Sequence, residues 1–320
     1  MEKVVNPRGL VPVAVKTLQA QRDISFDLYL WQSRNHPPRL YREKNVPLES
    51  ADLRRLLDEG VTTLYTRSCD VEQYCDHVRN HVLADEAIPA MERYCILRDA
   101  TRTVLMNSLG KRDVDGVLSV SADLGRDMVS LICDRKNVFN DLLAVMVHDY
   151  SVFTHVTNVC TCSIVLAEAY GIHDREQLTQ IAQGALFHDV GKCFIPAKVL
   201  NKATPLTPDE QEIIRQHPAR GFEELCLRPD LSWGQLMMVY QHHERYDGRG
   251  YPSGLVGNET HEWGRLCAVA DVYEALTRDR PYRKGASIKD VLEYMDRESG
   301  RSFDEEICQC WIATLTQCQP

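Results

Sequence analysis

Two short segments constrain the fold of this chain most strongly. The first contains His188, Asp189 and Lys192, and the second begins with the adjacent pair His242 and His243. Imidazole and carboxylate groups bind transition metals, and a metal centre needs several of them within a few ångströms. Because both segments follow apolar stretches with helical spacing, we predict that helices of a bundle bring these ligands together.

Three further residues extend this candidate ligand set. His155 lies in a long apolar helical stretch, His217 precedes Pro218, and Asp271 stands inside the apolar run 267–273. A buried carboxylate costs free energy unless it has a partner, so Asp271 should contact a cation or a hydrogen-bond donor. Histidine and aspartate side chains from several helices suit a metal centre in a bundle core, with iron, manganese or zinc as candidate ions.

Other readings of the polar residues stay open at this point. A single His next to an Asp is by default a hydrogen-bonded core pair, so His188 and Asp189 gain weight only from the other ligands. His77 and His81 stand one helical turn apart, but without a third ligand nearby we expect a solvated helix surface. Glu244 could orient an imidazole or form a surface salt bridge.

The segment pattern predicts a mainly α protein with a small N-terminal α/β domain. The expected strands are 11–15, 27–31 and 62–66, and the expected helices of this part are 51–57 and 71–82. From residue 85 onward, apolar residues recur at three- and four-residue spacing. We therefore assign residues 1–84 to the N-terminal domain, 85–135 to a helical connector and 136–320 to the C-terminal helical domain that carries the candidate ligands.

Capping residues mark several helix starts in the C-terminal part. Thr207 and Glu210 form a capping box, and His217 is expected late in the helix that they open. Ser287 and Ser302 are predicted to open two further helices. These starts predict short, well-delimited helices around the longer apolar ones.

Composition and charge exclude several classes of function. The chain has 37 Lys and Arg against 46 Asp and Glu, a net charge of −9, which disfavours a general nucleic-acid binder because such proteins need a basic surface. No apolar run approaches the roughly 20 residues of a membrane span. The 12 cysteines lack paired C-x-x-C motifs, and no charged-then-apolar signal segment is recognisable, so we expect free thiols in a reducing cytoplasm.

Together, these motifs resemble the HD-GYP family, a branch of the HD-superfamily phosphohydrolases that degrades cyclic di-GMP. The resemblance covers residues 145 to about 290 and implies an HD-type helical bundle for the C-terminal part. The motifs that carry it, in the order and spacing of the family, are HDVGK at 188–192, LTP at 206–208, QHP at 216–218, HHERYDGRGYP at 242–252, AVADVYEALT at 268–277 and DRPYR at 279–283.

The resemblance implies a dinuclear metal centre with a role for each ligand. The implied ligands are His155, His188, Asp189 and Asp271 for one metal, and Asp189, His217, His242 and His243 for the other. A hydroxide between the metals is then expected to attack phosphorus. Asp189, as the bridge, and Lys192, as a cation near the phosphoryl oxygens, are the implied catalytic residues. The implied substrate contacts are Asp149, Lys192, Tyr251, Glu274, Arg280 and Arg283.

Departures from the family pattern modify this expectation. Some members carry a Glu one helical turn before the first His ligand and bind a third metal with it. Ser151 occupies that position here and is a poor ligand, so we expect two divalent ions, iron or manganese, and no third. Glu274 replaces the usual Asp, and Arg283 can replace Lys; both substitutions keep the charge but change the reach of the side chain.

The expected function is hydrolysis of cyclic di-GMP to linear pGpG, with continuation to GMP left open. One alternative keeps the mechanism but takes another 3′,3′-cyclic dinucleotide, such as cyclic GMP-AMP. A second alternative is a catalytically silent cyclic di-GMP receptor, although no ligand of the motif is missing. Residues 1–84 are expected to have a regulatory or homodimer-forming role and to contact signalling partner proteins; neither nucleic acid nor a membrane is an expected partner.

Overall fold

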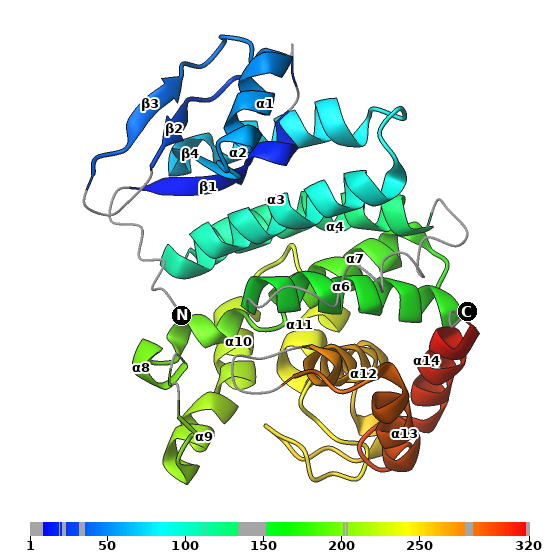
Figure 1. Ribbon diagram of the computed structural model, residues 1–320. Helices are drawn as coiled ribbons and strands as arrows, with labels where there is room; N and C mark the ends of the chain where they lie inside the picture. The colour runs from blue at the N-terminus through cyan, green and yellow to red at the C-terminus, as the bar shows by residue number, and fades with distance from the viewer. Residues whose placement is uncertain are drawn as a thin grey trace. The chain divides into compact units, whose positions relative to one another are not determined.

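The computed structural model divides into two compact units, residues 1–111 and 112–320 (Figure 1). The structure describes residues 9–317 except 19, 21–23, 32–35, 112, 134–151, 201, 203 and 279–283. The segment predicted as a connector, 85–135, is shared between the units. Helix α3 (Ala90–Lys111) belongs to the first unit, where it contacts the sheet, and α4 (Val114–Cys133) belongs to the second.

The first unit contains a four-stranded antiparallel sheet. In their order across the sheet, the strands are β1 (Leu10–Ala14), β4 (Thr63–Arg67), β2 (Leu28–Leu30) and β3 (Arg39–Arg42). Its helices are α1 (Ser50–Asp58), α2 (Val71–Val78), a π-helical turn (Arg79–Leu83) and α3. The three predicted strands and both predicted helices are present. Strand β3 was missed because Arg39–Arg42 lacks the apolar alternation that marks a half-buried strand.

His77 corrects one expectation about this unit. Its side chain is 4% exposed and packs edge-on against Phe26, with ring centroids 5.9 Å apart. Burial lowers the pKa of His77 to about 4, so the ring is neutral at pH 7. The predicted solvated surface is therefore wrong at His77, because tertiary packing covers this face of α2.

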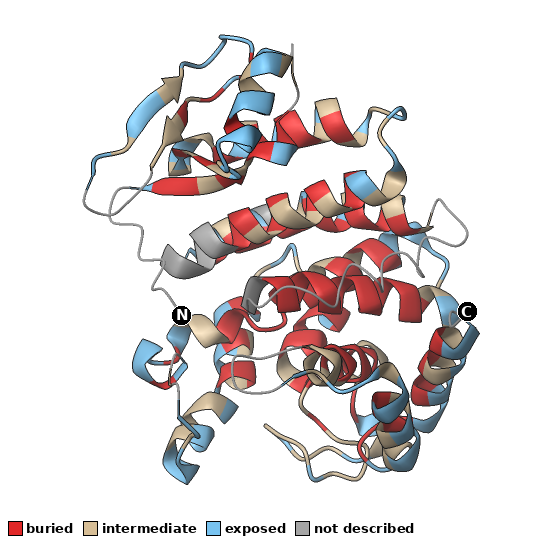
Figure 2. Ribbon diagram, viewed as in Figure 1, coloured by how far each residue is buried: buried red, intermediate tan, exposed pale blue. Residues whose placement is uncertain are grey.

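The second unit is a helical bundle. Its longer helices are α4, α6 (Val152–Ala169), α7 (Arg175–Phe187), α12 (Glu262–Thr277) and α14 (Glu305–Gln317). The shorter ones are α8 (Ala197–Leu200), α9 (Pro208–Arg215), α10 (His217–Leu225), α11 (Trp233–Gln241) and α13 (Ile288–Glu298), with 3-10 turns at η4 (Val190–Phe194) and η5 (Gly257–Glu259). Helix α6 is buried from residue 154 to 167, so it forms the centre of the bundle (Figure 2). The predicted mainly α fold with a small N-terminal α/β part is confirmed.

Side-chain caps set several helix boundaries. The Thr207 hydroxyl accepts from the backbone N–H of Glu210, and Ser287 caps α13 in the same way, as predicted. Helix α14, by contrast, starts at Glu305, and the residue whose carboxylate accepts a hydrogen bond from its first turn is Asp304. The predicted start at Ser302 is therefore wrong by a few residues.

Two findings concern the cysteines and the helices of the described residues. Their cysteines are free thiols. Among the described helices, none combines the length and apolar composition that a membrane span requires.

Candidate metal centre

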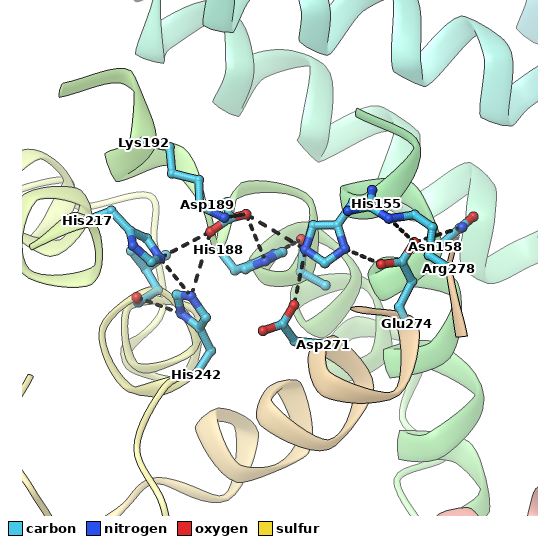
Figure 3. Close-up of polar contacts among 12 residues, drawn as sticks. His155, Asn158, His188, Asp189, Lys192, His217, His242, Asp271, Glu274 and Arg278 are labelled. Atoms are coloured by element: carbon cyan, nitrogen blue, oxygen red, sulfur yellow. Dashed lines mark hydrogen bonds and ion pairs between the residues drawn. The ribbon is translucent and has the colours of Figure 1, made fainter. Parts of the chain in front are cut away.

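The seven predicted ligands converge inside the bundle. Figure 3 shows six of them, all except His243. Their ligand atoms form three overlapping groups, each within 4.8 Å: His155, His188 and Asp271; His188, Asp189 and His242; His217, His242 and His243. The groups overlap through His188 and His242. The site is therefore one continuous cluster with two ends.

Helix ends and one close backbone approach position these side chains. His188 and His242 directly follow the last residues of α7 and α11, and His217 is the first residue of α10 rather than a late residue of α9 as predicted. Pro218 has no N–H to continue the ladder of α9, so the chain starts a new helix there. A Cβ at Gly191 would lie 1.9 Å from the carbonyl oxygen of His217. Glycine at this position therefore lets the turn after Asp189 reach α10.

Asp189 lies between the two ends of the cluster. Its Oδ1 is 3.2 Å from His217 Nε2 and 3.8 Å from His242 Nε2. Its Oδ2 is 3.5 Å from His188 Nε2 and 3.8 Å from His155 Nε2. The side chain is only 6% exposed, and each carboxylate oxygen faces a different group of imidazoles. This arrangement suits a carboxylate that bridges two metal ions.

Lys192 and two of the neighbouring imidazoles stabilise the charge of Asp189. Burial by itself raises the pKa of this carboxyl, but the ion pair with Lys192 and the nearby His188 and His217 rings hold it well below its usual range. The Lys192 side chain is 29% exposed and that of Asp189 only 6%, so Lys192 lies between the buried carboxylate and solvent.

Four of the histidines present the same ring atom to the cluster. The Nδ1 atoms of His188, His217 and His242 lie 2.7, 2.8 and 2.9 Å from the carbonyl oxygens of Ala185, Ile214 and Met238, to which each can donate. The Nδ1 of His155 contacts the Glu274 carboxylate. Hydrogen bonds at Nδ1 fix the tautomer that leaves Nε2 as the ligand atom, as in many metal sites.

The end around His155 is rich in carboxylates. Its Nε2 lies 3.1 Å from Asp271 Oδ1, and its Nδ1 contacts Glu274, which also accepts from Asn158 Nδ2 at 3.2 Å. Burial lowers the pKa of His155, but Glu274 and Asp271 outweigh burial and raise it to about 9. Glu274 was expected to contact the substrate. It is 2% exposed and faces His155, a geometry that favours orientation of this imidazole.

The opposite end consists of imidazoles. The rings of His217, His242 and His243 lie with centroids 4.2 to 5.2 Å apart. Burial, together with the neighbouring imidazoles, lowers the pKa of His242 well below its usual value. Burial lowers that of His243 to about 3, and His217 adds to this shift. These two rings are neutral at pH 7 and have lone pairs available for a cation.

The donor set fits a divalent metal. His188 Nε2 is buried in the cluster without a hydrogen-bond partner among the described residues. A buried polar atom of this kind is costly unless a cation or water satisfies it. Imidazole nitrogens and carboxylate oxygens in these proportions suit iron, manganese or zinc.

A Gly-flanked loop lies against the imidazole end. The Tyr251 ring stacks on His243 with centroids 4.8 Å apart and an interplanar angle of 24°. Burial raises the pKa of the Tyr251 hydroxyl, and the Asp271 and Asp189 charges add to this effect. Tyr251 therefore lies in the electrostatic environment of the metal-ligand candidates.

Glu244 holds this loop in place. Its carboxylate is 5% exposed and accepts from the backbone N–H groups of Ser253, Gly254 and Leu255, at 2.7, 3.1 and 3.2 Å for the shortest contact of each. Neither role considered from the sequence describes these contacts. The sequence signal for this role was an acidic residue next to a Gly-rich loop, because the backbone N–H groups of such a loop need an acceptor.

Asp149, Ser151, Arg280 and Arg283 lie outside the described residues. Their expected roles, including the lack of a third metal ligand at Ser151, therefore remain predictions.

Comparison with known proteins agrees with the motifs. A family model described as an HD domain matches residues 130–307. A cyclic di-GMP phosphodiesterase of Pseudomonas aeruginosa is 31% identical over 195 residues, which cover 61% of this chain and 47% of the relative. A 3′3′-cGAMP-specific phosphodiesterase of Vibrio cholerae is 32% identical over 180 residues, covering 55% and 34%. The chain spans less than half the length of the curated relatives it matches.

A solved structure extends the fold comparison to nearly the whole chain. Bd1817, a HDG"Y"P protein from Bdellovibrio bacteriovorus, aligns with a TM-score of 0.69 at 19% identity and covers 96% of this chain and 99% of its own. This likeness shows a shared fold. The matching family model spans more than half of the chain and places it in the HD-domain family, and the motifs at His188 and His242 make it a member of the HD-GYP branch.

Proposed function

We propose that this chain is a metal-dependent phosphodiesterase that hydrolyses cyclic di-GMP to linear pGpG. The position of Asp189 carries the proposal, because its two oxygens face two separate imidazole groups. A single carboxylate between two groups of imidazole ligands is the arrangement that a dinuclear hydrolytic centre needs. An ordinary protein core does not bury this many imidazole and carboxylate lone pairs, because each is costly unless a donor or a cation satisfies it.

We assign two divalent ions, iron or manganese, to this site. The residues that would hold one ion are His155, His188, Asp189 and Asp271, and those that would hold the other are Asp189, His217, His242 and His243. When bound, such ions activate water and neutralise charge that develops on phosphoryl oxygens.

The remaining side chains bind and orient the substrate. Lys192 lies beside Asp189 and is partly exposed, so its ammonium group can donate to a phosphoryl oxygen that approaches from solvent. Tyr251 forms part of the substrate mouth through its stack on His243. Asp149, Arg280 and Arg283 remain proposed nucleotide contacts, whereas the buried position of Glu274 favours an indirect role through His155.

A second substrate has a specific observation in its favour. One of the relatives is named as specific for 3′3′-cGAMP, and it is about as similar to this chain as the relative named for cyclic di-GMP. Both substrates carry two phosphodiester groups, so the metal centre and Lys192 serve either one. A silent receptor is a weaker candidate because all seven ligand residues are present and gathered.

The other proposals concern the setting of the enzyme. The free thiols of the described cysteines fit a reducing compartment such as the cytoplasm. The N-terminal α/β unit is proposed to serve regulation, homodimer formation or contact with signalling proteins. Measuring oligomeric state and turnover after its removal tests that role.

The decisive experiment combines metal analysis with turnover. Protein purified without oxygen is reconstituted with iron or manganese and assayed with cyclic di-GMP and cyclic GMP-AMP. We expect two metal ions per chain and a linear product, and the ratio of kcat/KM values identifies the preferred substrate. Two bound metals and tight dinucleotide binding without any product would instead establish the receptor.

A further inference from the structure

The sequence motifs did not identify one cationic side chain, Arg215, that lies beside the metal-ligand cluster. Arg215 is the last residue of α9, and its guanidinium carbon lies over the Tyr251 ring, 5.3 Å from the centroid. The same ring stacks on His243 at 4.8 Å. Tyr251 thus contacts a metal-ligand candidate and an exposed arginine at once.

The charge of Arg215 is available for a ligand. No carboxylate among the described residues pairs with it, whereas Lys192 is already ion-paired with Asp189. Arginine stays protonated at any physiological pH. A guanidinium that rests on an aromatic face keeps its N–H groups in its own plane, where they can donate to a phosphate through two parallel hydrogen bonds.

The location of Arg215 suggests which part of a substrate it contacts. His243 belongs to the cluster, Tyr251 lies against it, and Arg215 lies over Tyr251, so the cation is beyond the metal ligands rather than among them. The whole chain carries a net charge of −9, which repels an anionic ligand unless local cations face it. A cyclic dinucleotide carries two phosphodiester groups, and only one at a time can occupy the metal cluster.

We propose that Arg215 is a substrate-binding residue whose guanidinium holds the phosphate that is not being hydrolysed. This inference rests on the proposed phosphodiesterase function. Arg215 then favours substrates with two phosphates, because a mononucleotide bound at the cluster has no second phosphate for its guanidinium.

Two substitutions and a matched control test this role. Arg215→Gln removes the charge, and Arg215→Lys keeps the charge without the planar fork. Arg220→Gln removes an equal charge from an exposed arginine of the next helix, which lies near Glu223 at 3.8 Å. Each protein is assayed for metal content, for kcat and KM with cyclic di-GMP, and for the Kd of a hydrolysis-resistant phosphorothioate analogue.

We expect Arg215→Gln to raise both KM and Kd about tenfold, the effect of losing roughly one charge-assisted hydrogen bond. Metal content should stay unchanged and kcat should change less than about twofold, since the lost contact is made equally before and during reaction. Arg215→Lys should fall between wild type and Arg215→Gln. Arg220→Gln should match wild type.

The outcomes separate this inference from the proposed function. Equal KM values for Arg215→Gln and Arg220→Gln would overturn the role of Arg215 while leaving the phosphodiesterase intact. A loss of kcat or metal at unchanged KM would also overturn it, because Arg215 would then act through Tyr251 or the fold. Wild-type protein that binds the analogue but does not hydrolyse cyclic di-GMP, with binding weakened by Arg215→Gln and not by Arg220→Gln, would overturn hydrolysis but support Arg215. Failure of wild type to bind the analogue would overturn both.

Discussion

The two ends of the metal-ligand cluster contain the same residue type in opposite states. At the acidic end, His155 contacts Asp271 and Glu274, and its pKa is raised to about 9. At the imidazole end, burial lowers the pKa of His243 to about 3. The difference shows that protonation of a ligand histidine depends on which groups surround it. At pH 7 a metal ion must displace a proton from His155 at the acidic end, whereas His243 at the imidazole end has no proton to lose from its ligand nitrogen.

Asp189 is what the two ends share. Its Oδ2 faces the acidic end and its Oδ1 faces the imidazole end. Substitutions at Asp189 should therefore affect both ends, and substitutions at residues of one end should leave the other nearly unchanged. Single substitutions at each end test that division.

Asp189→Ala should have the largest effect. Loss of the shared carboxylate should remove both metals and lower turnover by at least about 10³-fold, as expected when a catalytic unit is broken. Metal analysis and turnover measure the two losses together. Asp189→Asn, which keeps the volume, should give a similar loss. Full metal content in Asp189→Ala would show that Asp189 is not the bridge.

Lys192→Ala should separate catalysis from metal binding. Lys192 contacts Asp189 but offers no lone pair to a metal when protonated, so the metal content should stay at two ions. Loss of a cation that stabilises the transition state should lower kcat about 10²-fold. An equal loss of metal and activity would show that Lys192 maintains the cluster instead.

Glu274→Gln should weaken the acidic end alone. The substitution replaces the carboxylate that contacts His155 Nδ1, and loss of such an orienting partner typically weakens metal affinity about 10- to 100-fold. A metal titration should then resolve one weakened and one unchanged site. Glu262→Gln, on the same helix but in its first turn, is the matched control. Equal weakening of both sites would contradict the division into two ends.

Glu244→Gln tests how the loop depends on a buried carboxylate. A neutral amide accepts less strongly from the N–H groups of residues 253–255, so their hydrogen exchange should accelerate about 5- to 10-fold. KM should rise by a similar factor while metal content stays constant. Glu259→Gln alters a more exposed carboxylate of the same region, which accepts from one N–H group, and should have little effect. Unchanged exchange in Glu244→Gln would remove its positioning role.

Proton release on metal binding gives the smallest signal. Because the pKa of His155 in the metal-free protein is raised to about 9, this ring is protonated at pH 7 and must lose its proton to bind a metal. We therefore expect release of about one proton at pH 7, declining as pH rises through about 9. Calorimetry in buffers with different ionisation enthalpies measures this number. Glu274→Gln should reduce it, and buffer-independent heats would contradict the charged state of His155.

Local chemistry accounts for the features that were predicted well. Thr207 and Ser287 cap their helices because a side-chain oxygen next to a free N–H group needs no distant partner. The strands around residues 11, 28 and 64 follow from their apolar alternation. Strand β3 was missed because its pairing with β2, rather than local propensity, makes it a strand. The start of α14 was missed because the Asp304 carboxylate, and not Ser302, accepts from its first turn.

By itself, the sequence determined the mainly α architecture, the HD-GYP membership and the set of candidate ligands, because residue type and spacing carry that information. Only the tertiary structure decided which oxygen of Asp189 faces which imidazoles, that Glu274 contacts His155, and that Arg215 lies over Tyr251. The physical reason is that these contacts join residues far apart in the sequence, from different helices, turns and loops. Burial and neighbouring charge, which set their protonation, exist only after the helices have packed.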